Sequence, residues 1–436
     1  DYSLLTRSSD GQMLFLANML SKMKHDTPLG SRIAEVHNGS SLFTGDAGQG
    51  ESNIRRWVIE SDWLEAIVAL PLNMFYNTGI ATYVWVLTNR KPAHRKGKVQ
   101  LIDATQWFRP LRKNMGKKNC ELAPEDIQRI CDTFLSFQET PQSKIFPNAA
   151  FGYWKVKVER PLRLNSQLSR ARIETLRFAS GDEDLRAALY EQLGDALFEN
   201  PASVRKQLEA LVNDWGKADA AEADDDDEDA EGAARKALPE SKKKKLLNED
   251  TWRRDALLIV TATKLRETLG DALVSDHNLF LEQVQACLKE LNLRPTAAEL
   301  KLIVGAVSWR DEAAARVLKK IHKLGKVQAD PLNGLFEATI DGKSCIVEYE
   351  PDSELRDFEQ IPLLEEGGIA AFIRREVLPY TPDAWIVEAD TKIGYEVSFT
   401  RHFYQPPTLR TLAEISADIL ALEQETEGLL SEITRG

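Results

Sequence analysis

Residues 64–88 read LEAIVALPLNMFYNTGIATYVWVLT and contain two strand-like runs. Residues 64–70 form an apolar run typical of a buried strand, and residues 81–88 are rich in β-branched and aromatic side chains. The ten uncharged residues between the two runs are too many for a tight hairpin turn. Something other than turn geometry therefore sets the length of this loop.

The residues on either side extend these two strands into an α/β segment. Apolar residues recur with helical spacing over 13–23, and residues 33–36 and 99–103 have strand character. Ser52 is a candidate N-cap for a helix over 53–60. Doubly wound sheets usually contain five or more strands, so these few strands predict only half of one. We expect the missing half to be encoded upstream.

The rest of the chain is predicted to be mostly helical, with a small β-hairpin. Its expected elements are a helix over 124–137 with Pro124 in its first turn, a connector over 138–165 with a strand at 153–158, helices within 167–215 and 250–325, a hairpin over 335–349 turning at Asp341–Gly342, and a long helix over 409–434. Residues 219–231 hold nine acids, and Lys242–Lys245 follow them, so we interpret 217–246 as a flexible, solvated linker.

Composition excludes several classes of protein. The 436 residues carry a net charge of −12, which rules out a uniformly basic protein that coats nucleic acid. Residues 1–138 nevertheless hold 17 Lys and Arg against 14 Asp and Glu, so the two parts of the chain face different partners. The four cysteines lie far apart, and neither they nor the six histidines have metal-ligand spacing, so we expect reduced thiols, a cytoplasmic protein and no metal site. No apolar run approaches the length of a membrane span.

The loop between the two strands offers a stacking surface beside hydrogen-bonding groups. Phe75 and Tyr76 are followed by Asn77 and Thr78 and preceded by Asn73. An extruded nucleobase needs this combination, because its faces stack on aromatic rings and its edge forms hydrogen bonds. The alternative is that Phe75 and Tyr76 fill core space beneath the loop.

A basic cluster follows the second strand. Between residues 90 and 118 there is one acid, Asp103, and the ten cationic residues are Arg90, Lys91, Arg95, Lys96, Lys98, Arg109, Arg112, Lys113, Lys117 and Lys118. Such a cluster can neutralise DNA phosphates. The alternative is a solvated basic loop in an otherwise acidic protein.

The predicted C-terminal helix carries a heptad seam. Its members alternate in spacing between three and four residues and are Leu412, Ile415, Ile419, Leu422, Thr426, Leu429 and Ile433. A seam of this length suits either a partner helix or the core of this chain.

Several stretches in order resemble the modification (methyltransferase) subunit of type I restriction-modification systems. They are GSRIAEVHNGSSLFTGDAGQGESNIRRWVIESDWLEAIVALPLNMFYNTGIATYVWVLTNRK, KVQLIDATQWF, FGYWKVKVERPLRL and a tail that includes EYEPDSELRDFEQIPLLEEGG and TKIGYEVSFTRHFY. The resemblance implies a Rossmann-like methyltransferase core that transfers methyl from S-adenosylmethionine to the N6 of adenine in duplex DNA. It also implies a DNA-specificity subunit as partner, packed beside the heptad seam, and a separate restriction (motor) subunit.

The resemblance also assigns roles and exposes departures. In related adenine methyltransferases an aromatic residue in this loop packs on the flipped adenine, and the matching position is Phe75. The Asn-Pro-Pro-Phe/Tyr catalytic tetrad and the glycine-rich cofactor turn before it have no counterpart here. The run from Gly45 to Gly50 is interpreted as a flexible loop instead. We therefore expect that the chain begins after the catalytic motif, binds no cofactor alone and cannot methylate alone.

The predicted organisation has four segments: residues 1–138 as the C-terminal half of the methyltransferase core, 139–216 as a connector with helices, 217–246 as the linker, and 247–436 as a helical assembly domain. Two alternatives remain open. One is a non-catalytic assembly module that binds the specificity subunit and DNA. The other is a standalone DNA-binding protein that uses residues 90–118.

Overall fold

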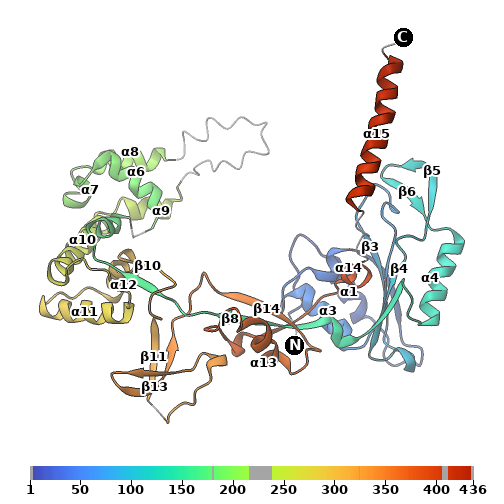
Figure 1. Cartoon of the computed structure of the whole chain (residues 1–436), viewed down its shortest axis with the longest axis horizontal. Coiled ribbons are helices and arrows are strands. Elements are labelled where there is room, and N and C mark those ends of the chain that lie inside the picture. The colour runs from blue at the N-terminus through green and yellow to red at the C-terminus, as the bar shows by residue number, and fades with distance from the viewer. Residues whose placement is uncertain (1–2, 179–180, 216–237, 324, 405–410, 434–436) are drawn as a thin grey trace. The chain divides into compact units, whose positions relative to one another are not determined.

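The computed structural model describes residues 3–178, 181–215, 238–323, 325–404 and 411–433 (Figure 1). It divides into two compact units, each built from separate stretches of the chain. Unit 1 comprises residues 1–156, 359–372 and 391–436, and unit 2 comprises residues 157–358 and 373–390. This division does not follow the four continuous segments expected from the sequence, because stretches beyond residue 358 return to unit 1. Most of the predicted linker, residues 217–237, lies outside the described residues.

A five-stranded mixed sheet forms the centre of unit 1. Its strands, in spatial order, are β1 (Arg32–Asn38), β3 (Thr82–Thr88), β2 (Leu64–Ala69), β4 (Lys98–Asp103) and β7 (Ser143–Pro147). The four strands predicted from sequence in this part of the chain are confirmed, and β7 falls in a stretch predicted to be irregular. The α/β class is therefore confirmed, whereas the Rossmann-like arrangement remains a prediction.

Strand β3 sits between β1 and β2 and runs antiparallel to both. Strands β1 and β2 therefore run in the same direction, and β4 pairs in parallel with β2. All six residues of β2 are buried, as expected for a strand covered on both faces. The consequence is that three strands end at one edge of the sheet.

Helices cover both faces of this sheet. On one face, Ile67, Trp85 and Leu101 pack in a cluster with Leu16 of α1 (Gln12–Ser21) and Ile54 of α3 (Gly50–Glu60). On the other face, Val68 and Ile102 pack against Ile130 and Phe134 of α4 (Pro124–Ser136). Pro124 occupies the first turn of α4, as predicted.

The predicted N-cap of α3 is wrong. The helix begins at Gly50 after Gln49, so Ser52 lies inside it. The Ser52 hydroxyl instead accepts a hydrogen bond from the backbone N–H of Tyr395 at 3.0 Å.

Residues 391–404 return to unit 1 and are held there by a buried arginine. Strand β16 (Lys392–Tyr395) pairs with the first half of β8 (Gly152–Glu159), and α14 (Phe399–Phe403) follows it. The guanidinium of Arg55, 0% exposed, donates to the carbonyl oxygens of Tyr395 at 2.6 Å, Ser41 at 3.0 Å and Thr44 at 2.7 Å. Burial lowers the pKa of Arg55 to about 10, so the group stays charged at neutral pH.

The remaining elements of unit 1 are short, apart from the C-terminal helix. They are α2 (Ser40–Phe43), η1 (Ala93–Arg95), β5 (Arg109–Met115), β6 (Lys118–Glu121), η2 (Asn148–Phe151), α13 (Gly368–Phe372) and α15 (Leu412–Ile433). The heptad residues of α15 whose side chains are described are all exposed; they are Leu412, Ile415, Ile419, Leu422 and Thr426. The core-helix alternative therefore does not hold for these five, while the side chains of Leu429 and Ile433 lie outside the described residues.

Unit 2 contains two helical clusters and short antiparallel strands. Its helices are α5 (Arg170–Glu174), η3 (Thr175–Arg177), α6 (Glu183–Leu193), α7 (Ala196–Glu199), α8 (Arg205–Asp214), α9 (Glu240–Leu246), α10 (Glu249–Leu269), α11 (His277–Glu290), α12 (Ala297–Ala306), η4 (Pro331–Asn333), the π-helical turn η5 (Ile373–Val377) and η6 (Glu388–Asp390). Its strands are β9 (Leu164–Ser166), β10 (Ser308–Arg310), β11 (Leu318–Lys323), β12 (Phe336–Ile340), β13 (Lys343–Tyr349) and β15 (Trp385–Ile386), and β14 (Asp357–Pro362) spans the boundary of the units.

The structure confirms the hairpin at Asp341–Gly342 and corrects two expectations nearby. The helical reading of 250–325 fails at β10 and β11, because β11 pairs with β13 of the hairpin and β10 with β9. The last residues of the predicted linker form α9, because Leu246 is buried in a cluster with Trp252.

Replacing the buried Arg55 is predicted to destabilise unit 1. Arg55→Met leaves three carbonyl oxygens without their charged donor, and each orphaned buried group costs about 1–3 kcal/mol. We expect the free energy of unfolding to fall by roughly 3–5 kcal/mol in urea titrations. The matched control, Arg56→Met, removes an i,i+4 ion pair with Glu60 and should change stability by less than about 0.5 kcal/mol. Equal effects of the two substitutions would contradict this role of Arg55.

Candidate nucleic-acid interface

The carboxyl ends of β1, β2 and β4 lie at one edge of the unit 1 sheet. Asn38 at the end of β1 pairs with Thr82, and Ala69 at the end of β2 pairs with Tyr83. Ala69 also lies beside Asp103, the last residue of β4. Ligand sites of open α/β sheets form at the carboxyl ends of their strands, so the segments that leave this edge are the candidates.

The predicted base-contact loop, residues 70–81, leaves this edge between β2 and β3. Asn73 and Asn77 adopt left-handed φ angles of 58° and 56°, which asparagine tolerates better than most residues. Phe75 is 36% exposed and Tyr76 is 66% exposed, whereas Met74 packs in the core cluster beneath α4. The core-filling role thus falls to Met74, and the two aromatic rings remain accessible.

A hairpin that the sequence did not predict supports this loop. Strands β5 and β6 are joined at Gly116–Lys117, and Gly116 has a φ of 61° at the first central position of the turn. A Cβ added at Gly116 would lie 2.2 Å from Oδ1 of Asn77 and 3.4 Å from a ring carbon of Tyr76. The turn therefore packs directly on the loop, and its positive φ favours glycine.

Two further contacts fix the loop to β6. The backbone N–H of Asn119 donates to the carbonyl of Asn73 at 3.1 Å. The Sγ of Cys120 donates to the carbonyl of Leu72 at 3.1 Å. Burial raises the pKa of the Cys120 thiol, which keeps it in the protonated, donating form. All four cysteines are free, as expected.

The structure places the ten cations of this cluster in different environments, and it corrects the predicted phosphate contact of two of them. The ammonium group of Lys91 is buried and pairs with Asp62 at 2.6 Å. Arg95, 3% exposed, lies over the rings of Phe134 at 4.1 Å and Phe137 at 4.4 Å. The ammonium group of Lys91 and the guanidinium group of Arg95 are therefore occupied by acidic and aromatic partners inside unit 1. They cannot reach a phosphate.

The other cations fall into two groups. Arg90 is exposed but donates to the carbonyls of His25 and Thr27, and Lys96 and Lys98 are exposed near the amino end of β4, away from the loop. Arg109 pairs with Glu121 at 2.7 Å. The hairpin itself carries Arg112, Lys113, Lys117 and Lys118. Within the described part of the chain, the side chains of Arg112, Lys113 and Lys117 make no hydrogen bond or ion pair.

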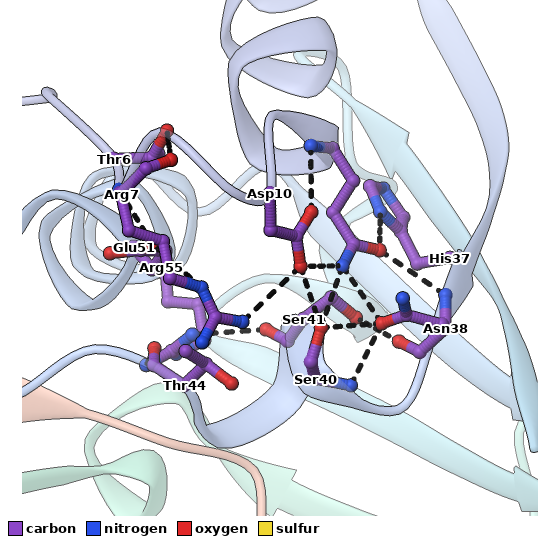
Figure 2. A network of polar contacts seen from close by, with 11 residues as sticks. Thr6, Arg7, Asp10, His37, Asn38, Ser40, Ser41, Thr44, Glu51 and Arg55 are labelled. Atoms are coloured by element: carbon purple, nitrogen blue, oxygen red, sulfur yellow. Dashed lines mark hydrogen bonds and ion pairs between the residues drawn. The ribbon is translucent and has the colours of Figure 1, made fainter. Parts of the chain in front are cut away.

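A polar network at the end of β1 was missed by the sequence reasoning (Figure 2). Nε2 of Gln12 lies 2.8 Å from Oδ2 of Asp10 and 2.8 Å from Oδ1 of Asn38, and Ser40 Oγ lies 3.0 Å from Oδ2 of Asp10. Burial alone would raise the pKa of Asp10, but hydrogen bonds from Gln12 and Ser40 outweigh it and lower the pKa. One signal for this network was present in the sequence: its polar residues lie at the start of α1 and at the end of β1.

The network continues along β1 to the buried side chain of His37 and the partly buried side chain of Glu35. Nδ1 of His37 lies 3.1 Å from Oε1 of Gln12, and Nε2 of His37 lies 3.2 Å from Oε2 of Glu35. Burial raises the pKa of Glu35 to about 7, and burial lowers the pKa of His37 to about 4 against the opposing charge of Asp10. A neutral His37 donates from Nδ1 to Oε1 of Gln12, whereas among the described residues neither Nε2 of His37 nor Oε2 of Glu35 has a hydrogen-bond partner.

The glycine-rich run at 45–50 does not form a cofactor cradle. Gly50 begins α3 and is buried, and a Cβ added to it would lie 2.0 Å from the carbonyl oxygen of Leu5. Asp46 pairs with Lys155 at 2.6 Å. Other parts of the chain therefore pack against residues 45–50, which were expected to form a flexible loop. The described residues hold no cluster of side chains suited to a metal ion and no helix able to cross a membrane.

Comparison with known proteins identifies the class. Residues 3–151 match the N-6 DNA methylase family. The chain is 33% identical over 114 residues to the type I restriction enzyme MjaIX methylase subunit of Methanocaldococcus jannaschii, and the match covers 26% of this chain and 19% of that protein. It is 35% identical over 119 residues to the HindI methylase subunit of Haemophilus influenzae, covering 26% and 24% of the two chains. Residues 3–151 are therefore similar in sequence to N-6 DNA methylases.

The named relatives of this segment are methylase subunits of type I restriction enzymes, which confirms the resemblance seen in the sequence. The match spans only about a fifth to a quarter of the length of these relatives. A solved type I methyltransferase subunit from Streptococcus thermophilus is 27% identical, with a TM-score of 0.28 and coverage of 33% of this chain and 28% of that chain.

The opposite pKa shifts of Glu35 and His37 predict that the stability of unit 1 depends on pH. Glu35 holds a proton in the folded state up to about pH 7 but loses it near 4.5 when unfolded, so its contribution to stability falls as pH rises across this window. His37 contributes the opposite slope, rising from about pH 4 to 6.5. In urea titrations at a series of pH values, the stability of Glu35→Gln relative to wild type should rise between about pH 4.5 and 7. A pH-independent difference would contradict the raised pKa of Glu35. Glu125→Gln, an exposed site on α4, is the matched control.

The hairpin cations are predicted to contribute to salt-dependent DNA affinity. Each phosphate contact adds about 0.9 to the slope of log K against log salt on duplex DNA. Lys113→Gln and Lys117→Gln should each lower that slope by about 1 in anisotropy titrations of a labelled duplex. Lys98→Gln, near the amino end of β4, should leave the slope unchanged. Equal losses at all three lysines would argue for diffuse attraction without a defined interface.

Proposed function

We propose that this chain is part of the modification subunit of a type I restriction-modification system, which transfers methyl from S-adenosylmethionine to the N6 of a flipped adenine in duplex DNA. The observation that carries the proposal is the accessible ring of Phe75 on a loop at the carboxyl edge of the sheet, beside a hairpin with unpaired cations. The matched family and the named relatives supply the class of reaction.

The loop has the chemistry to hold an everted adenine. The exposed face of Phe75 stacks on the base, and Tyr76, 66% exposed, extends the same surface. Asn73 lies two residues before Phe75, in a left-handed conformation, and offers a carboxamide that both donates and accepts hydrogen bonds. Because the Gly116 turn packs on Asn77, the loop is supported before DNA arrives, which lowers the entropic cost of binding.

The methyl donor is proposed to bind to a segment encoded outside this chain. The Gly45–Gly50 turn is filled by Leu5 and Glu51, so it leaves no room for a cofactor against the backbone. The sequence contains no Asn-Pro-Pro-Phe/Tyr tetrad to hold the adenine amino group. We therefore propose that the chain alone does not methylate and supplies the wall of the site opposite the catalytic motif.

The partners of the whole protein follow from the same proposal. Helix α15 exposes the described apolar residues of its heptad seam, Leu412, Ile415, Ile419 and Leu422, as expected for a helix that packs beside the DNA-specificity subunit. The restriction (motor) subunit would join in the full complex, because the sequence contains no phosphate-binding loop of the GxxxxGK[ST] type.

Methyl transfer tests the role of Phe75. We expect no transfer of labelled methyl from S-adenosylmethionine to duplex DNA by this chain alone, and transfer once it follows the upstream half of such a subunit and is bound to the specificity subunit. In that complex, Phe75→Ala should lower the rate by about 10–100-fold, because one base–aromatic stack is worth about 1–3 kcal/mol.

Phe15→Ala, which removes a 68% exposed ring on α1, is the matched control and should leave the rate unchanged. Full activity of Phe75→Ala would remove this ring from the mechanism. Methylation by the chain alone would overturn the proposed division of the site. A complex that assembles and binds DNA without methylating would favour the non-catalytic assembly module.

A further inference from the structure

A separate cavity lies in unit 1 on the side of the hairpin. Its volume is about 690 Å³, within the range of small-molecule sites. The walls come from the base-contact loop, through Leu72 and Asn73, from the segment after β4, through Gln106 and Phe108, and from the hairpin, through Asn114 and Asn119. Phe75 does not line it. One loop thus contributes to two different surfaces.

The lining combines free hydrogen-bonding groups with an exposed ring, and it contains no charged residue. Four carboxamides line it, from Asn73, Gln106, Asn114 and Asn119, and in the described part of the chain none of these side chains has a hydrogen-bond partner. Each presents two donors and one acceptor. Phe108 is 41% exposed and Leu72 is 54% exposed, so apolar faces stand beside these amides.

The neighbouring Trp107 shows that the exposure of Phe108 is not a general property of this segment. Trp107 is 6% exposed, packs in the cluster beneath α4, and lies 4.3 Å from the guanidinium of Arg129. Trp107 therefore has a structural role, whereas the adjacent ring of Phe108 is left for a ligand.

Positive charge surrounds the neutral cavity. Arg112 and Lys113 lie in β5 between the lining residues Leu111 and Asn114, and Lys117 lies in the turn. A ligand that suits this arrangement has a flat, neutral, hydrogen-bonding ring attached to anionic groups. A nucleobase on a phosphate backbone has this chemistry, since bases stack on aromatic rings while cations track the phosphates.

We propose that this cavity binds a second unstacked nucleobase of the DNA strand, distinct from the adenine assigned to Phe75. The inference rests on the proposed action of the chain on DNA and deepens it. Phe108 stacks on this base, and the carboxamides of Gln106, Asn114 and Asn119 bond to its edge. The site would hold a nucleotide displaced from the duplex when the target adenine is everted.

A one-base oligonucleotide separates the two surfaces. The probe is a labelled 12-nucleotide single strand of abasic sites with one central 2-aminopurine, and the reference is the same strand without any base. We expect the full chain to bind the one-base strand about tenfold more tightly by anisotropy, as one base–aromatic stack predicts. The 2-aminopurine fluorescence should fall as the base stacks.

Variants identify the surface responsible. The variants are compared in a Phe75→Ala background, which removes the ring assigned to the target adenine, a ring that does not line the cavity. In that background the one-base strand should still bind more tightly and be quenched. Adding Phe108→Ala or Asn114→Leu should abolish both effects, while adding Asn18→Leu, which changes an exposed carboxamide on α1, should retain them. Melting curves confirm that each variant is folded.

The outcomes distinguish this inference from the proposed function. Loss of the advantage in Phe75→Ala alone would place the base at the target-adenine surface and overturn the second site, as would equal affinity for the two strands. Either result leaves the action on DNA standing if the hairpin cations still give salt-dependent duplex binding. Failure to bind any DNA would instead contradict the proposed function itself.

Discussion

The insertion of β3 between β1 and β2 is the constraint on which the interface depends. Because β3 is antiparallel to both neighbours, β1 and β2 point the same way, and the parallel pairing of β4 adds a third strand in that direction. Three carboxyl ends and the start of β3 therefore meet at one edge. The base-contact loop, the segment with Phe108 and the Asp10–Gln12–Asn38 network all leave or border that edge. A change of register in β3 by one residue would turn Trp85 outward and displace all three.

The loop and the hairpin act as one surface because backbone contacts join them. The carbonyls of Leu72 and Asn73 accept from Cys120 and Asn119, and the Gly116 turn packs on Asn77. These contacts leave the rings of Phe75 and Phe108 accessible, while Met74 is partly buried and Trp107 is buried. In each segment a packed residue precedes an exposed ring: Met74 precedes Phe75, and Trp107 precedes Phe108. The packed residues anchor the backbone, and the two rings can therefore be held in place for stacking.

Much of this edge could be predicted from residues 64–88, because an apolar run and an aromatic strand need little context to be recognised. The length of the loop between them also signalled a surface with a role beyond chain reversal. The basic hairpin could not be predicted, since its strand over 109–115 is exposed and charged and carries no apolar alternation. Lys91 and Arg95 were misassigned for a related reason: their partners, Asp62 and Phe134, are distant in sequence. The return of residues 391–404 to unit 1 likewise depends on Arg55, whose burial no local pattern signals.

Photo-crosslinking at the target base tests the position of Phe75 most directly. The adenine to be methylated is replaced by 5-iodouracil in a duplex bound by the reconstituted modification complex, and the crosslinked peptide is sequenced by mass spectrometry. If the ring faces the everted base, the DNA is attached to Phe75 or Tyr76, within the tryptic peptide that spans Trp57 to Arg90. Attachment confined to other peptides of a complex that still methylates its normal duplex would contradict the placement of this loop against the target base.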